Sequence, residues 1–467
     1  MATSYRPAGG RIPAARWLAL LPVLLAAALQ GCDGSPVLGG AFASPPPRER
    51  YATALERAGL DRRALGRAWL GAGDSALAAA AAMVPPFRTT GYLAPSEPAA
   101  VAYRFDLRRG QRLRAGVGWR SPAPGEVFVD LFELPEDPGD EPRRRASADS
   151  GATHLEYEVR RDGAYLLRIQ PELLHGGRYT AEVEAAPSLA FPIPRLDSRA
   201  VRSRFGVERD AGRRRHEGVD IFAPRGSPVV SAADGIVSEV GTNRLGGLVI
   251  WVLDPGRQQL LYYAHLDSQI AREGTRIRRG DTLGLVGNTG NARTTPPHLH
   301  FGIYTMDEGA VDPLPFIHHP TERPAPLAVE LELVGEWARA ARRSARLRAA
   351  PDSAAGLVGT VPRHAPVRVH AAAGRWYQVA LVDGTTGFLG PADLESLDRP
   401  VATERLRTPR PIRDAPTEAA AVRDIAAAGS RLPVLARFGD YLFVRAPDGR
   451  PGWMPRATGL ASARGSR

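Results

Sequence analysis

The chain of 467 residues contains no lysine and only one cysteine. All 61 basic residues are therefore arginines, which outnumber the 50 acidic residues and give a formal net charge of +11. A single cysteine excludes an internal disulfide, and a hydrophobic content of 43% excludes both a disordered chain and a polytopic membrane protein. A chain of this length predicts about two to four domains.

The arginines are dispersed along the chain rather than gathered in one block. Acidic residues lie between them, and no basic stripe alternates with aromatic residues, so nucleic acid is not an expected partner. A net positive charge favours contact with anionic polymers, such as cell-wall glycan strands, or with lipid headgroups. A general compositional preference for arginine explains the same charge without any partner.

Long apolar runs are scarce, and one of them lies near the start of the chain. The run WLALLPVLLAAAL, Trp17 to Leu29, follows Arg11 and Arg16. It is too short to span a bilayer comfortably, but basic residues followed by such a run are typical of a secretion signal. We therefore expect an exported protein, with residues 1–31 as its signal peptide.

The single cysteine follows this run almost directly. The stretch LQGC, Leu29 to Cys32, resembles the lipobox of bacterial lipoproteins. The resemblance implies cleavage before Cys32 and lipidation of its thiol. Acyl chains rather than a transmembrane helix would then anchor the protein to a membrane, facing the periplasm or the cell wall. The alternative is a plain signal peptide with an unrelated cysteine.

In the next part of the chain, changes in composition and in the spacing of apolar residues indicate separate segments. Residues 32–49 are rich in Gly, Pro and Ser and are expected to form a tether. Residues 50–86 are predicted to be a helical segment, because apolar residues recur there at roughly helical spacing. From 87 to 188 apolar and polar residues alternate in short runs between turn residues, which predicts a β-sandwich accessory domain. The stretch APSLAFPIP, residues 186–194, is expected to be a linker.

The last part of the chain contains an internal repeat with a period of 65 residues. The stretch GRWYQV from Gly374 matches GDYLFV from Gly439, and other short stretches match at the same offset. Such similarity indicates two copies of one small unit, here residues 335–398 and 402–460. Both copies resemble bacterial Src-homology-3-type barrels, and the resemblance implies either binding of wall peptides or glycans or a role as spacers.

Histidine is scarce, with ten residues, yet two of them lie two positions apart in HLHFGIY, at His298 and His300. The stretch predicts a strand, in which residues two apart point to one face while Leu299 and Phe301 point to the other. Two imidazoles on one face indicate a metal or catalytic site, although paired histidines also occur by chance.

A second stretch, RRRHEGVDIFAP, contains His216, Gly218 and Asp220, which a strand would place on one face. Neutral imidazole and carboxylate are suitable zinc ligands, and Gly218 is expected to leave room for a substrate backbone. The helical HExxH motif is excluded because position 220 is Asp and a glycine and a valine intervene. Glu217 is expected to point away from the metal face.

A third stretch, LLYYAHLDS, places His265 on the face that it shares with Tyr263 in a regular strand. Taken in order, the three stretches resemble the lysostaphin/LytM-type zinc metallopeptidase family over about residues 200–317. SRFGVERD, from Ser203, is similar to the first strand of that family. The resemblance implies an antiparallel-β peptidase domain, placed at residues 195–320. The expected fold is therefore mainly β and multidomain: helical segment, sandwich, peptidase domain and two small barrels.

The resemblance also implies a role for each site residue. His216, Asp220 and His300 would bind one Zn²⁺, and His265 and His298 would be a catalytic pair that does not touch the metal. Three protein ligands leave one position for water, and two free imidazoles can divide the proton transfers that peptide hydrolysis needs. No position of the five departs from the family pattern, which argues for an active enzyme.

The resemblance implies an endopeptidase that hydrolyses peptide cross-links of bacterial peptidoglycan. Lipidation and a long tether favour D,D-endopeptidase activity, because glycine bridges belong to thick walls outside a single membrane. Four arginines, Arg213, Arg214, Arg215 and Arg293, could flank the groove, and at least one of them is expected to bind a stem-peptide carboxylate; the alternative is that they are ordinary members of an arginine-rich surface. Two alternatives remain open: a non-catalytic activator of a separate wall amidase, and a wall-binding lipoprotein.

Overall fold

The structure is a computed structural model, and it describes residues 44–137, 139–209, 212–318 and 323–456. The expected signal peptide, Cys32 and most of the tether lie outside these residues. The chain divides into two compact units, Leu189–Ile317 and the combination of Pro46–Ser188 with the part from His318 onward. Both units are built mainly from β-strands, which confirms the predicted fold class. Within the described ranges, no helix combines the length and apolarity needed to cross a membrane.

The helical segment is shorter than predicted. It consists of α2 (Pro47–Arg57), the 3-10 helix η2 (Leu60–Arg62) and α3 (Ala64–Ala78). Trp69 of α3 is buried, and its Nε1 donates to the Pro171 carbonyl oxygen at 2.8 Å. The alanine run does not continue the helix, because Ala81 and Ala82 pair instead with Tyr103 and Arg104 as the short strand β1. Backbone pairing with a neighbouring strand thus overrides the helix propensity of alanine.

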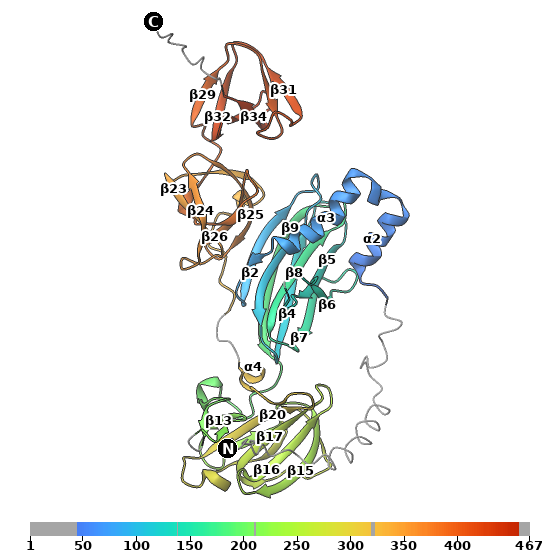
Figure 1. Ribbon diagram of the computed structural model, residues 1–467, viewed down its shortest axis with the longest axis vertical. Helices are drawn as coiled ribbons and strands as arrows, with labels where there is room; N and C mark the ends of the chain where they lie inside the picture. Colours follow the sequence, from blue (N-terminus) through green and yellow to red (C-terminus); the bar gives the residue numbers. More distant parts are fainter. Residues whose placement is uncertain (1–43, 138, 210–211, 319–322, 457–467) are drawn as a thin grey trace, which may run out of the picture. The chain divides into compact units, whose positions relative to one another are not determined.

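The sandwich consists of two sheets whose apolar faces meet in one core (Figure 1). One sheet has the order β1-β3-β8-β5-β6, and the other contains β2-β9-β4-β7. Tyr103 and Tyr179 are fully buried between the sheets, with their hydroxyl oxygens 2.6 Å apart. The strands are β2 (Phe87–Leu93), β3 (Val101–Leu107), β4 (Gln111–Arg120), β5 (Val127–Glu133), β6 (Arg143–Ser147), β7 (His154–Glu158), β8 (Gly163–Pro171) and β9 (Gly177–Pro187).

The two repeats form two small β-domains. Arg348 pairs with Phe388 in the first copy, and Arg413 pairs with Trp453 at the equivalent positions of the second. The first copy contains η5 (Leu331–Leu333), β22 (Trp337–Ala340), β23 (Ser344–Arg348), β24 (Leu357–Pro362), β25 (Pro366–Ala373), β26 (Trp376–Leu381), β27 (Thr386–Leu389), η6 (Pro391–Asp393) and β28 (Leu394–Ser396). The second contains β29 (Ala402–Arg405), β30 (Arg410–Arg413), β31 (Val422–Ala426), β32 (Arg431–Phe438), β33 (Tyr441–Arg445) and β34 (Pro451–Pro455).

The first barrel shares a sheet with the sandwich, which the sequence did not indicate. Strand β2 pairs with β9 along one edge and with β25 of the barrel along the other. Backbone hydrogen bonds therefore continue from the sandwich into the first barrel, and the two domains are joined through one continuous sheet.

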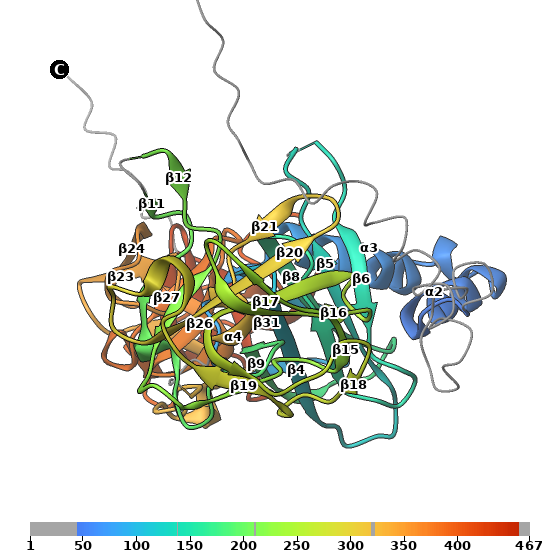
Figure 2. The same cartoon turned by 90° about the horizontal axis from the view of Figure 1, so that it is seen from below.

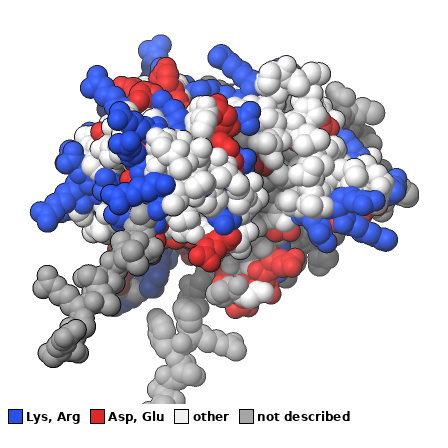
Figure 3. Space-filling model, turned by 90° about the horizontal axis from the view of Figure 1, so that it is seen from above, with Lys and Arg blue, Asp and Glu red and all other residues white. Residues whose placement is uncertain are grey.

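The arginines remain dispersed on the folded surface. On the face drawn in Figure 3, basic side chains alternate with acidic ones. Among the described residues, some arginines pair with nearby acids, as Arg114 does with Glu156 at 3.1 Å. The surface charge of this face is therefore mixed, in line with the spread of arginine along the sequence.

The unit Leu189–Ile317 is an antiparallel sheet in the order β10-β13-β20-β17-β16-β15-β18, and Figure 2 shows β20, β17, β16 and β15 side by side. Its elements are η3 (Ser198–Ala200), β10 (Val201–Ser203), β11 (Glu208–Arg209), β12 (Arg214–Arg215), β13 (Val219–Phe222), β14 (Pro228–Val230), β15 (Gly235–Asn243), β16 (Gly247–Asp254), β17 (Gln259–Gln269), β18 (Arg276–Ile277), β19 (Thr282–Val286), η4 (Gly290–Ala292), β20 (His298–Thr305), β21 (Gly309–Val311) and α4 (Leu314–Ile317).

From Leu189 onward, the stretch expected to be a linker belongs to this unit, whereas its first two residues end strand β9. Leu189, Phe191 and Ile193 are buried in its hydrophobic core. The Leu189 amide donates to the Phe316 carbonyl oxygen at 2.9 Å. The proline residues suggested a linker, but the alternating apolar residues between them pack against the sheet, and burial of that surface stabilises the ordered conformation.

Candidate metal centre

Two neighbouring strands bring the site together. In the antiparallel pair β13–β20, Asp220 lies directly opposite His300. Alternation along β20 sends Leu299 and Phe301 into the core, where both are fully buried, and leaves the two histidines on the other face. The prediction that His298 and His300 share one strand face is therefore confirmed.

His216 does not lie in the same strand as Asp220, contrary to the expectation from their spacing. It lies outside any strand, between β12 and β13, because β12 pairs only with β11 in a separate two-stranded sheet. The chain bends between the two sheets and still brings the His216 ring to Asp220. The spacing of His216 and Asp220 correctly indicated that their side chains lie close together. The local conformation that brings them together is a bend and not a continuous strand.

Gly218 within this bend is explained by packing and not by room for substrate. A Cβ atom at this position would lie 2.5 Å from the Phe301 carbonyl oxygen and 2.8 Å from the His300 ring. Only a residue without a side chain lets the bend approach β20 this closely.

Three side-chain donors converge on one point. His216 Nε2 lies 3.0 Å from Asp220 Oδ1 and 3.0 Å from His300 Nδ1, and His300 Nδ1 lies 3.1 Å from Asp220 Oδ1. Ligand atoms of a tetrahedral zinc ion, roughly 2.0–2.2 Å from the metal, are separated by roughly 3.3 Å. The observed separations are therefore close to those of a ligand set.

The positions of the protons on these side chains also suit the binding of a cation. His216 Nδ1 lies 2.8 Å from the Arg204 carbonyl oxygen, which can only accept, so Nδ1 carries the proton and donates. In the neutral ring Nε2 then has a lone pair, which faces the carboxylate of Asp220. Two acceptors at this distance repel each other unless a cation lies between them. Imidazole and carboxylate together suit a borderline ion such as Zn²⁺.

Asp220 is held as a carboxylate. Its burial alone would raise its pKa, but contacts with His216 and His300 outweigh this effect and hold the pKa well below its usual range. Burial lowers the pKa of His300, despite the opposing effect of the nearby carboxylate. Asp220 thus offers a negative charge, and His300 favours the neutral ring that a metal ligand needs.

His265 reaches the same face by an irregularity of its strand. Its φ of +63° lies in the left-handed region, and the register between β16 and β17 shifts next to it. The expectation that His265 shares a face with Tyr263 is wrong, because Tyr263 is fully buried in the core. The His265 ring instead lies 5.0 Å from the His298 ring and 5.9 Å from the His300 ring, between centroids.

His265 and His298 each have one ring nitrogen fixed by a backbone carbonyl. His265 Nδ1 donates to the Thr289 oxygen and His298 Nδ1 to the Pro296 oxygen, both at 2.9 Å. In each neutral ring Nε2 is then the nitrogen available for proton exchange. Burial, with the charges of His300 and His298 adding to it, lowers the pKa of His265 to about 4, so its imidazole is neutral at pH 7.

Arg209 is a site residue that the sequence did not reveal. Its Nη2 donates to Asp220 Oδ2 at 2.7 Å and to Ser203 Oγ at 2.6 Å. The guanidinium therefore occupies the carboxylate oxygen that faces away from His216 and His300 and fixes the orientation of the carboxylate. No spacing rule links Arg209 to Asp220, because the β11–β12 hairpin creates the contact.

Replacing Arg209 with glutamine is expected to weaken metal binding by about 10- to 100-fold, as is usual when a partner that orients a ligand is lost. Competition with a chelator measures the effect. Arg199→Gln is the matched control, because the Arg199 side chain is 87% exposed and pairs with neighbouring Asp197 on the surface, where ion pairs contribute little. Equal affinities in the two variants would show that Arg209 does not position Asp220.

The remaining predicted residues lie at the surface. Glu217 is exposed, and its carboxylate accepts from the Tyr304 hydroxyl at 3.3 Å, away from the ligand triad as expected. Arg213 and the two residues of β12, Arg214 and Arg215, are exposed, and Arg293 is exposed just after η4.

Comparison with known proteins assigns two parts of the chain. Residues 214–313 match the model of peptidase family M23, and residues 343–395 match that of the bacterial SH3 domain. The L-Ala–D-Glu endopeptidase of Bacillus subtilis is 38% identical over 139 residues, which cover 27% of this chain and 42% of that protein. The peptidoglycan DD-endopeptidase ShyC of Vibrio cholerae is 33% identical over 129 residues, covering 27% of this chain and 29% of that protein.

The chain thus spans less than half the length of these curated relatives. Among solved structures, the catalytic domain of lysostaphin from Staphylococcus simulans is 29% identical and covers 25% of this chain and 87% of that domain, with a TM-score of 0.22. The family matches confirm the resemblance that the motifs indicated. Residues 214–313 therefore form a domain of peptidase family M23, and a bacterial SH3 domain follows it in the same chain.

Proposed function

We propose that this protein is a zinc-dependent endopeptidase that hydrolyses peptide cross-links of bacterial peptidoglycan. The observation that carries the proposal is the convergence of His216, Asp220 and His300 beside two further imidazoles, His265 and His298. The activities for which the relatives are named support the substrate class, since they include a peptidoglycan DD-endopeptidase and an L-Ala–D-Glu endopeptidase.

The residues of the chain divide the work of peptide hydrolysis. When bound, Zn²⁺ supplies a Lewis acid that polarises the scissile carbonyl and makes water more acidic. His216, Asp220 and His300 hold the ion. His265 and His298 present Nε2 to the same face, where one accepts the proton of the attacking water and the other donates a proton to the leaving amine.

We further infer that the enzyme cleaves D,D cross-links. Lipidation at Cys32 and a long tether suit a thin wall between two membranes, where stem peptides are linked directly and not through glycine bridges. Arg215, next to His216, and Arg293 are exposed. Either guanidinium can hold a stem-peptide carboxylate through paired hydrogen bonds.

Incubation with a purified, directly cross-linked dimer muropeptide is expected to yield monomers, identified by mass spectrometry. Pentaglycine and the L-Ala–D-Glu bond should remain intact in the same assay. Cleavage of pentaglycine while the dimer survives would contradict the D,D assignment. A protein that binds zinc but cuts none of the three substrates would instead favour the non-catalytic activator of a wall amidase.

We also propose that Cys32 carries the lipid anchor. Replacing Cys32 with serine is expected to abolish acylation, because serine lacks the thiol, and to move the protein from the membrane to the soluble exported fraction. Radiolabelled palmitate followed by fractionation measures both effects. Identical fractionation of the wild type and the variant, or an unlabelled wild type, would show that the stretch LQGC is not a lipobox.

A further inference from the structure

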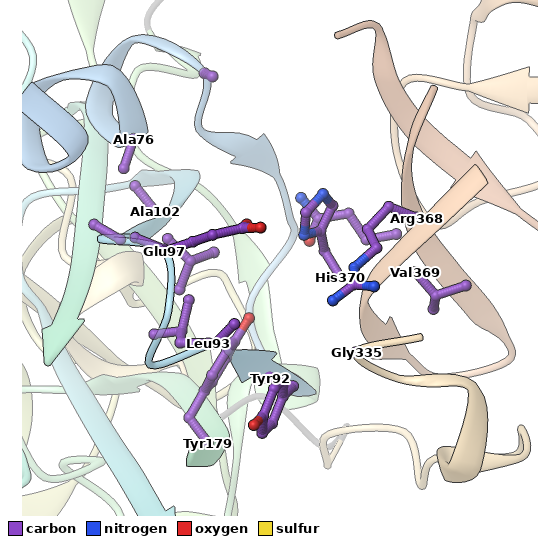
Figure 4. A pocket seen from close by; sticks show the side chains of 16 residues that line it. Ala76, Tyr92, Leu93, Glu97, Ala102, Tyr179, Gly335, Arg368, Val369 and His370 are labelled. Carbon is purple, nitrogen blue, oxygen red and sulfur yellow. The ribbon is translucent and has the colours of Figure 1, made fainter. Parts of the chain in front are cut away.

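A cavity of about 200 Å³ lies in the unit that contains the sandwich and the barrels. Strand β2 pairs with β25 only over Thr89–Gly91, but continues to Leu93 alongside β9. The two strands therefore separate beyond Gly91, and the cavity opens between them (Figure 4). Its volume is far above the roughly 10–15 Å³ that one water molecule requires, so a small organic ligand fits.

The walls of this cavity are mostly small and apolar. Leu93, Tyr92 and Tyr179 line the sandwich side. Gly335 closes the barrel side against the Tyr92 ring, where a Cβ atom would come within 2.8 Å of Tyr92 Cδ1. The rest of the apolar lining consists of two valines, Val101 and Val369, and six alanines, Ala76, Ala79, Ala94, Ala99, Ala100 and Ala102. Such walls offer apolar contacts to the methyl groups of a ligand.

Opposite charges face each other across the cavity. Glu97, between β2 and β3, points its carboxylate toward β25, from which Arg368 and His370 extend (Figure 4). Within the part of the chain that the structure describes, no ion pair joins Glu97 to either of them. The Arg368 guanidinium carbon lies 5.8 Å from the centre of the Trp337 ring, a cation–π contact that holds it in place. An anion and a cation on opposite walls suit a ligand that carries both charges.

We propose that this cavity binds a short zwitterionic peptide with small side chains, its ammonium group on Glu97 and its terminal carboxylate on Arg368. A guanidinium binds a carboxylate through paired, charge-assisted hydrogen bonds, and the alanine-lined walls accept methyl groups. All lining residues belong to the unit without the metal centre, so the site binds peptide ends without cleaving them. The proposal does not depend on peptidase activity.

Calorimetric titration of the whole exported chain with D-alanyl-D-alanine and with L-alanyl-L-alanine tests this site. At least one dipeptide is expected to bind with a one-to-one ratio. Acetylating its amine or amidating its carboxylate should weaken binding by about tenfold or more, because a hydrogen bond to a charged group is lost. A preference for the D,D form would identify a wall peptide as the source, and a preference for the L,L form a protein fragment.

Two variants test the two charged walls of the cavity one at a time. Glu97→Gln is expected to bind the free and the acetylated dipeptide equally well, and Arg368→Gln the free and the amidated one. Arg375→Gln is the matched control, since that arginine is exposed and lies outside the cavity lining. Absence of binding to the wild type at millimolar dipeptide, or unchanged discrimination in both variants, would overturn the proposal. Loss of binding in His300→Ala would place the peptide in the metal centre and overturn it too.

Discussion

Replacing His300 with alanine is expected to leave the protein without bound zinc and to lower cross-link hydrolysis by on the order of 10³-fold or more. His300 is one of the three convergent donors, and its Nδ1 lies about equally far from the other two. Two donors do not complete a stable site for Zn²⁺, which takes three or four protein ligands. Without the ion the reaction loses several kcal/mol of transition-state stabilisation, at 1.36 kcal/mol for each factor of ten.

Elemental analysis after zinc reconstitution and dialysis measures the metal, and muropeptide digestion measures the activity. His154→Ala provides the matched control, because His154 is an exposed histidine of β7 in the sandwich. We expect about one zinc per chain in the wild type and in this control. A wild-type protein that retains no metal, or a His300→Ala protein that retains all of it, would refute the ligand assignment.

Replacing His298 with alanine is expected to leave the zinc content unchanged, in contrast to His300→Ala. Turnover should fall by about 10²- to 10⁴-fold, the usual contribution of a general acid or base. His298 Nε2 lies 4.0 Å from Asp220 Oδ1, whereas the three ligand atoms lie within about 3 Å of one another. Its ring stacks on Phe222 with centroids 5.0 Å apart. His298 is therefore placed beside the metal centre and not in it.

Single-turnover digestion of the dimer muropeptide, together with elemental analysis, separates a chemical role from a ligand role. His298→Ala should lower kcat with little change in KM, since the loss concerns the transition state. His154→Ala again controls for the loss of a histidine elsewhere. Full activity in His298→Ala would remove this residue from the mechanism, and loss of zinc would make it a ligand.

Strictly local patterns were sufficient for much of the fold. The alternation in β3 and β9 predicted the sandwich, because a half-buried strand must alternate apolar and polar residues to bury one face. The repeat predicted two equivalent small domains, whose pairs Arg348–Phe388 and Arg413–Trp453 occupy matching positions. The alanine run failed as a helix signal after Ala78, because a pairing with a distant strand decided its conformation.

The residue types of the candidate site could also be predicted from the sequence. Residue types and their spacing predicted His216, Asp220, His298 and His300 as site residues, and the structure brings the first two and His300 together. Strand alternation explains the placement of His298 and His300, whereas a bend places His216. The motif order was enough to predict the family. These inferences need no knowledge of which strands are neighbours.

Contacts between residues far apart in the chain were decided only by the tertiary structure. The left-handed conformation of His265 depends on an irregularity between β16 and β17, and the contact of Arg209 with Asp220 depends on a hairpin outside the main sheet. The shared sheet of sandwich and barrel, with the cavity beside Arg368, requires β2 and β25 to meet. Periodicity records which face of its own strand a residue occupies. It carries no information about the partner strand, because pairing is selected by packing over the whole domain.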